Sequence, residues 1–230
     1  PKTLKNFKKT LVHLKDAQEF ISHQFDKLKK ELFIEKNKHT YIEIESLKKI
    51  KPLSFSLHHF FFPLGFNSKE VEKLVFSSPG KLILSKKYRL IRDRKYLILS
   101  PLLKKEINEI LIDLDKKNLK LPIPIKWEYI SNLEKKAHKN NEVFLDRETL
   151  KSPISLRKYK NGDYFYPSGM KGKKLLSKFF KDEKYSLLDK EEQWLLCSNG
   201  EIVWIIGKRC DNRFLARPNT KNKLLMRDLR

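Results

Sequence analysis

Glycine is scarce in this sequence: seven glycines occur among 230 residues, and no two are adjacent. Loops that cradle nucleotide phosphates depend on closely placed glycines, as in GxxxxGK[ST], GxGxxG or a Ser-Gly-Gly turn. None of these patterns is present. The residues therefore favour a binding portion over a catalytic one, and we expect no ATP site in this chain.

Cysteine is rarer still, with only Cys197 and Cys210, and neither a CxxC pair nor a histidine at zinc-finger spacing accompanies them. This indicates neither a disulfide framework nor a structural metal. The six histidines are scattered apart from His58-His59, and no Ser-His-Asp or Cys-His constellation can be assembled. We expect no catalytic residue, no metal site and a reducing, cytoplasmic location.

Long apolar runs are missing as well. No stretch approaches the roughly 18 apolar residues of a membrane-spanning helix, and no signal peptide is visible. We therefore expect no membrane partner. No initiator methionine precedes Pro1, from which we expect the sequence to be a piece of a longer protein.

Positive charge is in excess, with 51 Lys and Arg against 28 Asp and Glu and a net charge of +23. The excess is uneven: residues 1–100 carry a net +12, residues 101–153 carry +2 and residues 154–230 carry +9. Two basic lobes around a nearly neutral middle favour a polyanionic partner, nucleic acid first. A basic scaffold that docks acidic proteins is an alternative.

Residues 1–100 are predicted to form a helical subdomain with a small antiparallel meander. Apolar residues recur every three or four positions from Leu4 to Leu32, with one break at Gln18, which predicts one long amphipathic helix. We expect this helix to pack within the chain, and the seam of a coiled-coil homodimer is the alternative. Asn67 is a predicted N-cap for a helix that ends near Phe76. Alternation predicts the three strands of the meander, at residues 81–84, 88–91 and 95–99.

Residues 101–153 are predicted to be linking strands and loops, opening with a linker around Lys104-Lys105, and residues 154–230 a C-terminal domain. Two turns predict hairpins in that domain, one across Asn161-Gly162 and one across Asn199-Gly200. A helix is predicted from Lys173 to Phe180. The expected fold class is α+β, with the helical subdomain and its meander followed by a C-terminal α+β domain with an antiparallel sheet.

The stretch from Arg157 to Lys184 concentrates nine Lys or Arg against three acidic residues. Gly162, Gly169 and Gly172 are expected to form turns that bring backbone N–H groups and lysines together at a helix start. Such a place suits a phosphate. An ordinary solvated basic face is the alternative.

A second group of cations lies on the predicted meander. Basic residues on a hairpin either bind phosphate or protect a sheet edge, and the sequence leaves both open. This secondary basic patch comprises Lys86, Lys87, Arg89, Arg92 and Arg94.

Three motifs follow one another in order in the last third of the chain. They are R-x-x-x-x-G-D from Arg157 to Asp163, the GMKG turn with the helix after it, and G-x-R-x-D-x-R from Gly207 to Arg213. In these motifs the chain resembles the C-terminal domain of the tRNA(Ile)-lysidine synthases. Gly80-Lys81-Leu82 with the basic residues after it resembles the second domain of that family, so that the resemblance covers roughly residues 5–217.

The resemblance implies an enzyme that adenylates the wobble cytidine of a minor isoleucine tRNA with ATP and then attaches lysine. In the family, ATP with Mg²⁺ and lysine bind an N-terminal domain whose Ser-Gly-Gly-x-Asp-Ser loop is absent here. The chain would then be the portion that holds the tRNA, inactive on its own. A free-standing basic RNA-binding module is the alternative. Carried over by position, the tRNA contacts are Arg157, Lys158, Lys171, Lys173, Lys174, Lys178, Arg209 and Arg213.

Overall fold

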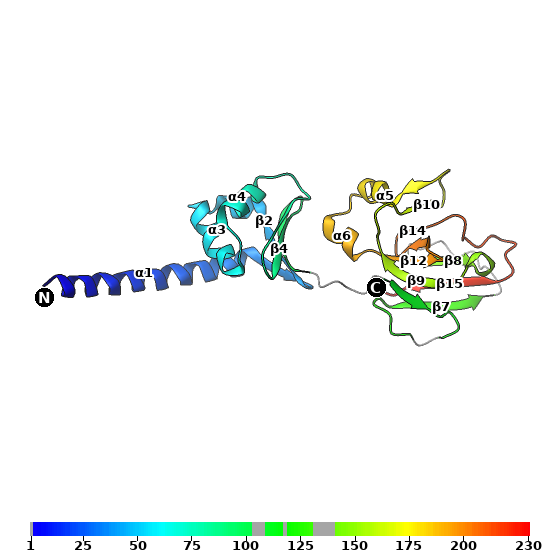
Figure 1. Ribbon diagram of the computed structural model, residues 1–230, viewed down its shortest axis with the longest axis horizontal. Coiled ribbons are helices and arrows are strands. Elements are labelled where there is room, and N and C mark those ends of the chain that lie inside the picture. The colour runs from blue at the N-terminus through cyan, green and yellow to red at the C-terminus, as the bar shows by residue number, and fades with distance from the viewer. Residues whose placement is uncertain (1, 103–108, 117–118, 131–140) are drawn as a thin grey trace. The chain divides into compact units, whose positions relative to one another are not determined.

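The computed structural model describes residues 2–102, 109–116, 119–130 and 141–230, and the chain divides into two units, residues 1–104 and 105–230 (Figure 1). Each unit combines helices with antiparallel sheets, which confirms the α+β class. Among these described residues, no helix has the length and apolar character that crossing a membrane requires. The predicted linker at Lys104-Lys105 lies outside the described residues.

Unit 1 opens with the predicted long helix, α1 (Lys2–Leu32). Near its end Phe25 is buried and stacks on His59, with 4.2 Å between the ring centroids. Leu4 and Leu14, by contrast, are 64% and 60% exposed, and the first part of α1 projects away from the other elements of unit 1 (Figure 1). Within unit 1, therefore, only the C-terminal part of α1 packs as predicted, because α3 (Leu53–Phe61), the helix that covers it, spans nine residues only.

The sheet of unit 1 has five antiparallel strands in the order β1-β2-β5-β4-β3. The predicted meander is confirmed as β3-β4-β5, and the hairpin β1-β2 extends it. Asn67 caps α4 as predicted, since its side chain accepts the N–H of Lys69 at 2.9 Å. Leu90 and Leu97 of the sheet pack against Leu57 and the other helical residues of the core. The bounds are β1 (Phe33–Lys36), β2 (His39–Glu43), α2 (Ile44–Lys49), η1 (Phe62–Leu64), α4 (Ser68–Val75), β3 (Leu82–Leu84), β4 (Tyr88–Arg92) and β5 (Tyr96–Pro101).

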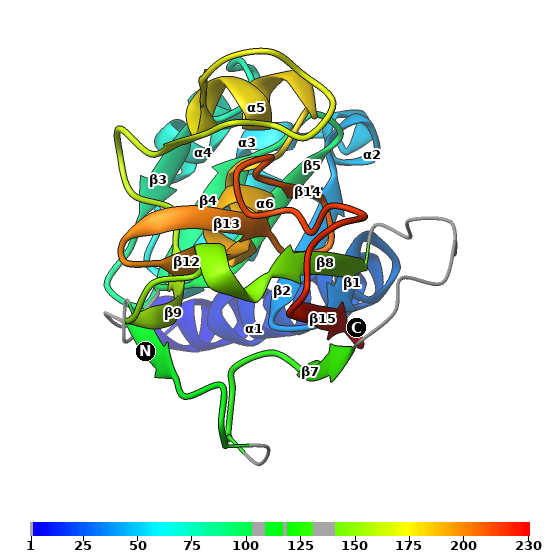
Figure 2. The ribbon, with the colours of Figure 1, turned by 90° about the vertical axis from the view of Figure 1, so that its right-hand side faces the viewer.

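The described residues of unit 2 contain two larger antiparallel sheets, one in the order β14-β13-β12-β9-β6 and one in the order β7-β15-β8, besides a two-stranded ribbon described below (Figure 2). Leu196 and Trp204 of the first sheet share one buried core with Leu145 and Met226 of the second. The two sheets therefore stabilise each other through their apolar faces. The bounds are β6 (Glu109–Ile112), β7 (Ile125–Ile130), β8 (Glu142–Asp146), η2 (Arg147–Thr149), β9 (Ile154–Lys158), β12 (Trp194–Ser198), β13 (Glu201–Ile205), β14 (Arg209–Cys210) and β15 (Lys223–Asp228).

The strands of residues 101–153 do not form the separate linking region that we expected. Strand β6 pairs with β9, and both β7 and β8 pair with β15. Ile112, Ile125 and Val143 are buried in the same core as the C-terminal strands. These strands belong to unit 2 because their apolar side chains are buried only when they pack against the later strands.

The first sheet of unit 2 buries its other face beneath α5 (Leu176–Asp182), and α6 (Leu187–Glu192) follows α5 in the chain. Strand β12 shows why both faces are apolar: Leu196 lies in the core between the sheets, whereas its neighbours Leu195 and Cys197 lie in the core under α5. This alternation follows from the period of two residues in a strand.

One of the two predicted hairpins is present. Strands β12 and β13 pair across Asn199-Gly200 as predicted. Strand β9 does not pair with the segment after Asn161-Gly162, because β12 and β6 already occupy both of its edges. That segment instead forms β10 (Tyr164–Phe165), which pairs with β11 (Lys174–Leu175). Because β11 occupies the first residues of the predicted helix, the helix begins three residues later than predicted, at Leu176 instead of Lys173.

Candidate nucleic-acid interface

The centre of the candidate interface is the segment that joins β10 to β11, residues 166–173, here called the basic loop. Its Lys171 and Lys173 are exposed. The loop is tied to β14, because the N–H of Ser168 donates to the carbonyl of Cys210 at 3.0 Å and Arg209 donates to the carbonyl of Ser168 at 3.2 Å. The pairing of β10 with β11 closes the loop at its base. The two lysines are therefore presented by an anchored segment.

The three turn glycines all adopt positive φ, which is costly for other residues. The φ angles are +88° at Gly162, +78° at Gly169 and +86° at Gly172. At the start of α5, where a phosphate site is expected, one backbone N–H is already occupied. The N–H of Leu176, at the first position of α5, already donates to the carbonyl of Asp163 at 2.8 Å.

The lysines around the basic loop differ in how they are held. The ammonium of Lys173 lies 3.8 Å from the ring centroid of Tyr164, a cation–π contact. Lys174 forms an ion pair with Asp182 at 2.7 Å, and this hydrogen bond lowers the pKa of the Asp182 carboxyl. Lys178 lies exposed on α5. Lys171, Lys173 and Lys178 are the best placed of the predicted contacts to meet a phosphate.

Arg157 does not fit its predicted role as a tRNA contact. Its side chain is only 5% exposed, and its guanidinium binds both carboxylate oxygens of Asp163, at 2.7 and 2.9 Å. Asp163 also accepts the backbone N–H of Lys160 at 2.8 Å. The R-x-x-x-x-G-D motif thus fixes the turn after β9, and this prediction is wrong because the pair is buried.

Arg213 is held on two sides by acidic groups. It bonds Asp211, which is fully buried, at 3.0 and 3.1 Å and Glu201 at 2.6 Å, and it lies over the ring of Tyr166 at 4.4 Å. The hydrogen bond to Asp211 is the main cause that raises the pKa of Arg213. Arg213 is therefore primarily an anchor for the segment after β14, with part of its guanidinium still exposed.

Lys158 and Arg209 also make structural contacts. The ammonium of Lys158 donates to the carbonyl of Glu192 at 2.7 Å and lies 4.1 Å from the ring centroid of Trp194. Arg209 lines an open cavity of about 580 Å³ together with Gly169 of the basic loop. Both remain candidate contacts, but neither is a freely moving surface cation.

The secondary basic patch of unit 1 is not a single patch. Arg89 is buried and its Nε donates to Ser100 at 3.3 Å, so it is unavailable to a ligand. Lys86 and Lys87 precede β4, whereas Arg92 and Arg94 come at or after its end. The five residues of this strand separate the two pairs by about 17 Å at the usual rise of about 3.3 Å per residue.

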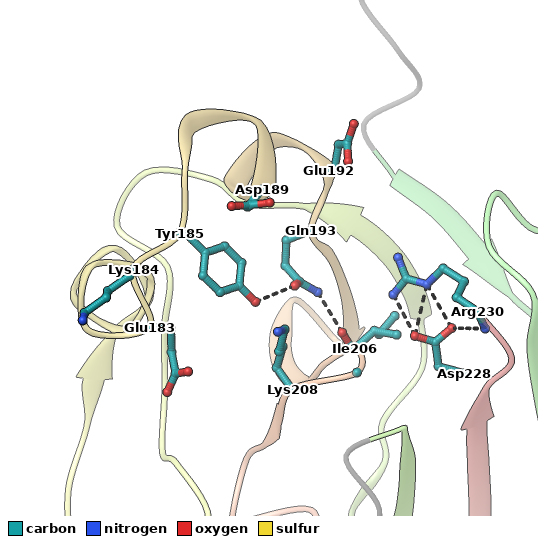
Figure 3. A pocket seen from close by; sticks show the side chains of 11 residues that line it. Glu183, Lys184, Tyr185, Asp189, Glu192, Gln193, Ile206, Lys208, Asp228 and Arg230 are labelled. Atoms are coloured by element: carbon teal, nitrogen blue, oxygen red, sulfur yellow. Dashed lines mark hydrogen bonds and ion pairs between the residues drawn. The ribbon is translucent and has the colours of Figure 1, made fainter. Parts of the chain in front are cut away.

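An open cavity of about 490 Å³ lies beside α6 (Figure 3). The hydroxyl of Tyr185 donates to Gln193 at 2.8 Å, and burial raises the pKa of Tyr185 to about 12. Arg230 and Asp228 are paired at 2.7 Å on the other side. Tyr185 is thus bonded to Gln193, and Arg230 to Asp228. Among the described residues, no three His, Cys, Asp or Glu side chains come together as metal ligands.

Both units match models of known protein families. The family model described as TilS substrate binding domain matches residues 35–102, and the one described as TilS substrate C-terminal domain matches residues 154–226. Over 219 residues, 93% of this chain, the sequence is 33% identical to the tRNA(Ile)-lysidine synthase of Parabacteroides distasonis. The chain belongs to the tRNA(Ile)-lysidine synthase family.

The chain spans about half, 49%, of the length of that synthase. It is also 35% identical to the synthase of Bacteroides thetaiotaomicron, over 71% of this chain and 37% of that protein. A solved structure titled as the TILS C-terminal domain covers 53% of this chain and 98% of its own, with 21% identity and a TM-score of 0.45. The two family models and the two synthases confirm the resemblance to the synthase family that the motifs indicated.

The sequence reasoning missed the aromatic residues of the interface. Tyr164 and Tyr166 of this synthase-family chain contact Lys173 and Arg213 respectively, whereas the sequence predicts them only as part of the hairpin across Asn161-Gly162. The alternation Tyr-Phe-Tyr at residues 164–166 was the available signal, since Phe165 is fully buried and its two neighbours are not.

Proposed function

We propose that this chain is the tRNA-holding portion of a tRNA(Ile)-lysidine synthase, the ATP-dependent ligase that attaches lysine to the wobble cytidine of the minor isoleucine tRNA. The observation that carries the proposal is the match of both units to TilS domains in a chain with a net charge of +23. The anchored lysines of the basic loop supply the surface. A cytoplasmic location stays a prediction.

The binding follows from charge and shape. Lys171, Lys173 and Lys178 engage phosphates, while RNA is recognised largely through the shape of its helix and its 2′-hydroxyls. Each neutralised phosphate releases counterions, so these three contacts give a slope of about −3 in log affinity against log salt.

A filter-binding titration of the chain with tRNA over a range of salt concentrations tests this proposal. We expect tight binding at low salt that weakens steeply as salt rises. Binding that does not respond to salt would contradict a phosphate-based interface. Equal retention of DNA duplex and tRNA would instead favour a general polyanion binder.

The chemistry of the ligase is proposed to reside outside these residues. ATP with Mg²⁺ would supply the activated adenylate and lysine the attacking amine. The residues present do not fit such a site, because the sequence has no glycine-rich phosphate loop and the described residues offer no cluster of metal ligands. We derive no catalytic step through this chain.

The homodimer that the sequence leaves open stays a prediction. The exposed apolar residues Leu4, Phe7, Leu11 and Leu14 of α1 recur with a spacing of three and four, as in a coiled-coil seam, and after the polar Gln18 the series continues at Ile21. Sedimentation equilibrium of the chain and of a Leu11→Glu variant tests it, since a dimer through this seam dissociates in the variant.

A further inference from the structure

The two-stranded ribbon β10-β11 exposes an apolar face beside the basic loop. Tyr164 and Leu175 are directly opposite in register and are 37% and 40% exposed. Opposite residues of an antiparallel pair lie on the same face. Phe165, the next residue along β10, is fully buried. The ribbon thus buries one aromatic ring and presents another to solvent.

Cations surround this exposed face. Lys173 lies over the ring of Tyr164, which contacts the ring of Tyr166 edge-on, with 6.2 Å between centroids and an interplanar angle of 79°. Arg213 lies over Tyr166 at 4.4 Å. Along this face, Lys173, the ring of Tyr164, the ring of Tyr166 and Arg213 therefore follow one another. A hollow of about 110 Å³ is lined by Tyr164 and Arg213.

The acidic groups next to this face are already neutralised. Asp163 is paired with the guanidinium of Arg157, and both Asp211 and Glu201 are bound by Arg213. Lys171 and Lys173 are ion-paired with no described residue and keep their charge available. The chemistry of the face is therefore aromatic and cationic, which complements a ligand that has both flat rings and negative charge.

We propose that Tyr164, Tyr166 and Leu175, here called the tyrosine platform, stack with unpaired nucleotides of the bound RNA while Lys171 and Lys173 hold the adjoining phosphates. The inference rests on the proposed function and adds which part of the RNA meets this surface. Bases within a duplex have their faces covered by their neighbours, whereas unpaired bases offer a face to aromatic side chains. An apolar peptide or a second copy of the chain would complement the rings but not the lysines.

The test compares two RNAs by fluorescence anisotropy: a blunt RNA hairpin and the same hairpin with a short single-stranded extension. The wild-type chain is expected to bind the extended RNA about tenfold more tightly, the effect of one stacked base. In the Tyr164→Leu variant this preference disappears while affinity for the blunt hairpin is unchanged. The matched Tyr164→Phe variant keeps the ring and keeps the preference.

A second variant guards against a folding defect. Leu175→Glu places a negative charge opposite Tyr164 at an exposed position and is expected to remove the same preference, with thermal melting as the check on folding. Equal wild-type affinity for both RNAs, or an equal loss for both RNAs in Tyr164→Leu, would overturn the platform. A dimer that Tyr164→Leu dissociates would also overturn it, by assigning the face to a second copy. A different result would contradict the proposed function itself: the wild-type chain would then show no salt-dependent binding to either RNA.

Discussion

Arg157 and Asp163 form a buried bidentate ion pair across the turn that follows β9, with nitrogen to oxygen distances of 2.7 and 2.9 Å. Removing one partner of a buried pair leaves the other charge uncompensated, which costs about 3–5 kcal/mol. We therefore expect Asp163→Asn to lower the free energy of unfolding of unit 2 by about 3 kcal/mol in urea titrations.

The matched control for this pair is Lys160→Met, which removes an exposed side chain from the same turn. We expect its unfolding midpoint to stay near that of the wild type. The double variant Arg157→Met with Asp163→Asn should recover part of the loss, because no unpaired charge is left buried. A loss in the double variant equal to the sum of the single losses would show that the pair is not coupled.

Charge reversal in the basic loop should weaken tRNA binding without unfolding the chain. In the Lys171→Glu, Lys173→Glu variant two phosphate contacts disappear, so the salt slope of the affinity should fall by about 2. The matched control reverses Lys151 and Lys221, two exposed lysines of the same unit outside the loop. Equal weakening by both double variants would mean that net charge alone, and not this loop, determines the affinity.

Both cysteines should be inert in the native protein. Burial raises the pKa of Cys197 to about 11 and raises the pKa of Cys210 further. Because the thiolate is the reactive form, about one Cys197 side chain in a thousand is reactive at pH 8. Ellman's reagent should therefore detect almost no thiol in the folded chain and both thiols in denaturant. Rapid reaction of the folded protein would contradict the burial.

The chain alone should not carry out the ligase reaction. Incubated with tRNA, ATP, Mg²⁺ and lysine, it should release no AMP above a blank without protein, because its sequence contains no glycine-rich phosphate loop to hold ATP for reaction. Thin-layer chromatography of labelled ATP measures this directly. AMP that appears only when both tRNA and lysine are present would refute the prediction.

Local signals in the sequence predicted those parts of the fold whose contacts are close in the chain. Asn67 caps its helix, and the turn at Asn199-Gly200 joins two neighbouring strands. The failures involve distant partners. Strand β9 is paired with β12 and β6, which lie far away in sequence, and no turn residue reveals that both edges of a strand are occupied.

The candidate site was predictable in position but not in detail. The excess of Lys and Arg in residues 157–184 correctly predicted that the lysines of the basic loop are exposed. It could not distinguish Arg157, which is buried against an acid six residues later, from Lys171, which is exposed, because both are cations in the same stretch. The exposed tyrosines were not predicted for a similar reason. The sequence pattern does not distinguish an aromatic ring that is buried in a core, such as Phe165, from one that is exposed to solvent, such as Tyr164.

The most direct test of the tRNA interface is acylation footprinting of the lysines with and without saturating tRNA, read by mass spectrometry. The proposed interface predicts that tRNA protects Lys171, Lys173 and Lys178, while Lys151 and Lys221 react at the same rate in both samples. Unchanged reactivity of the basic loop in a sample shown to contain bound tRNA would contradict it.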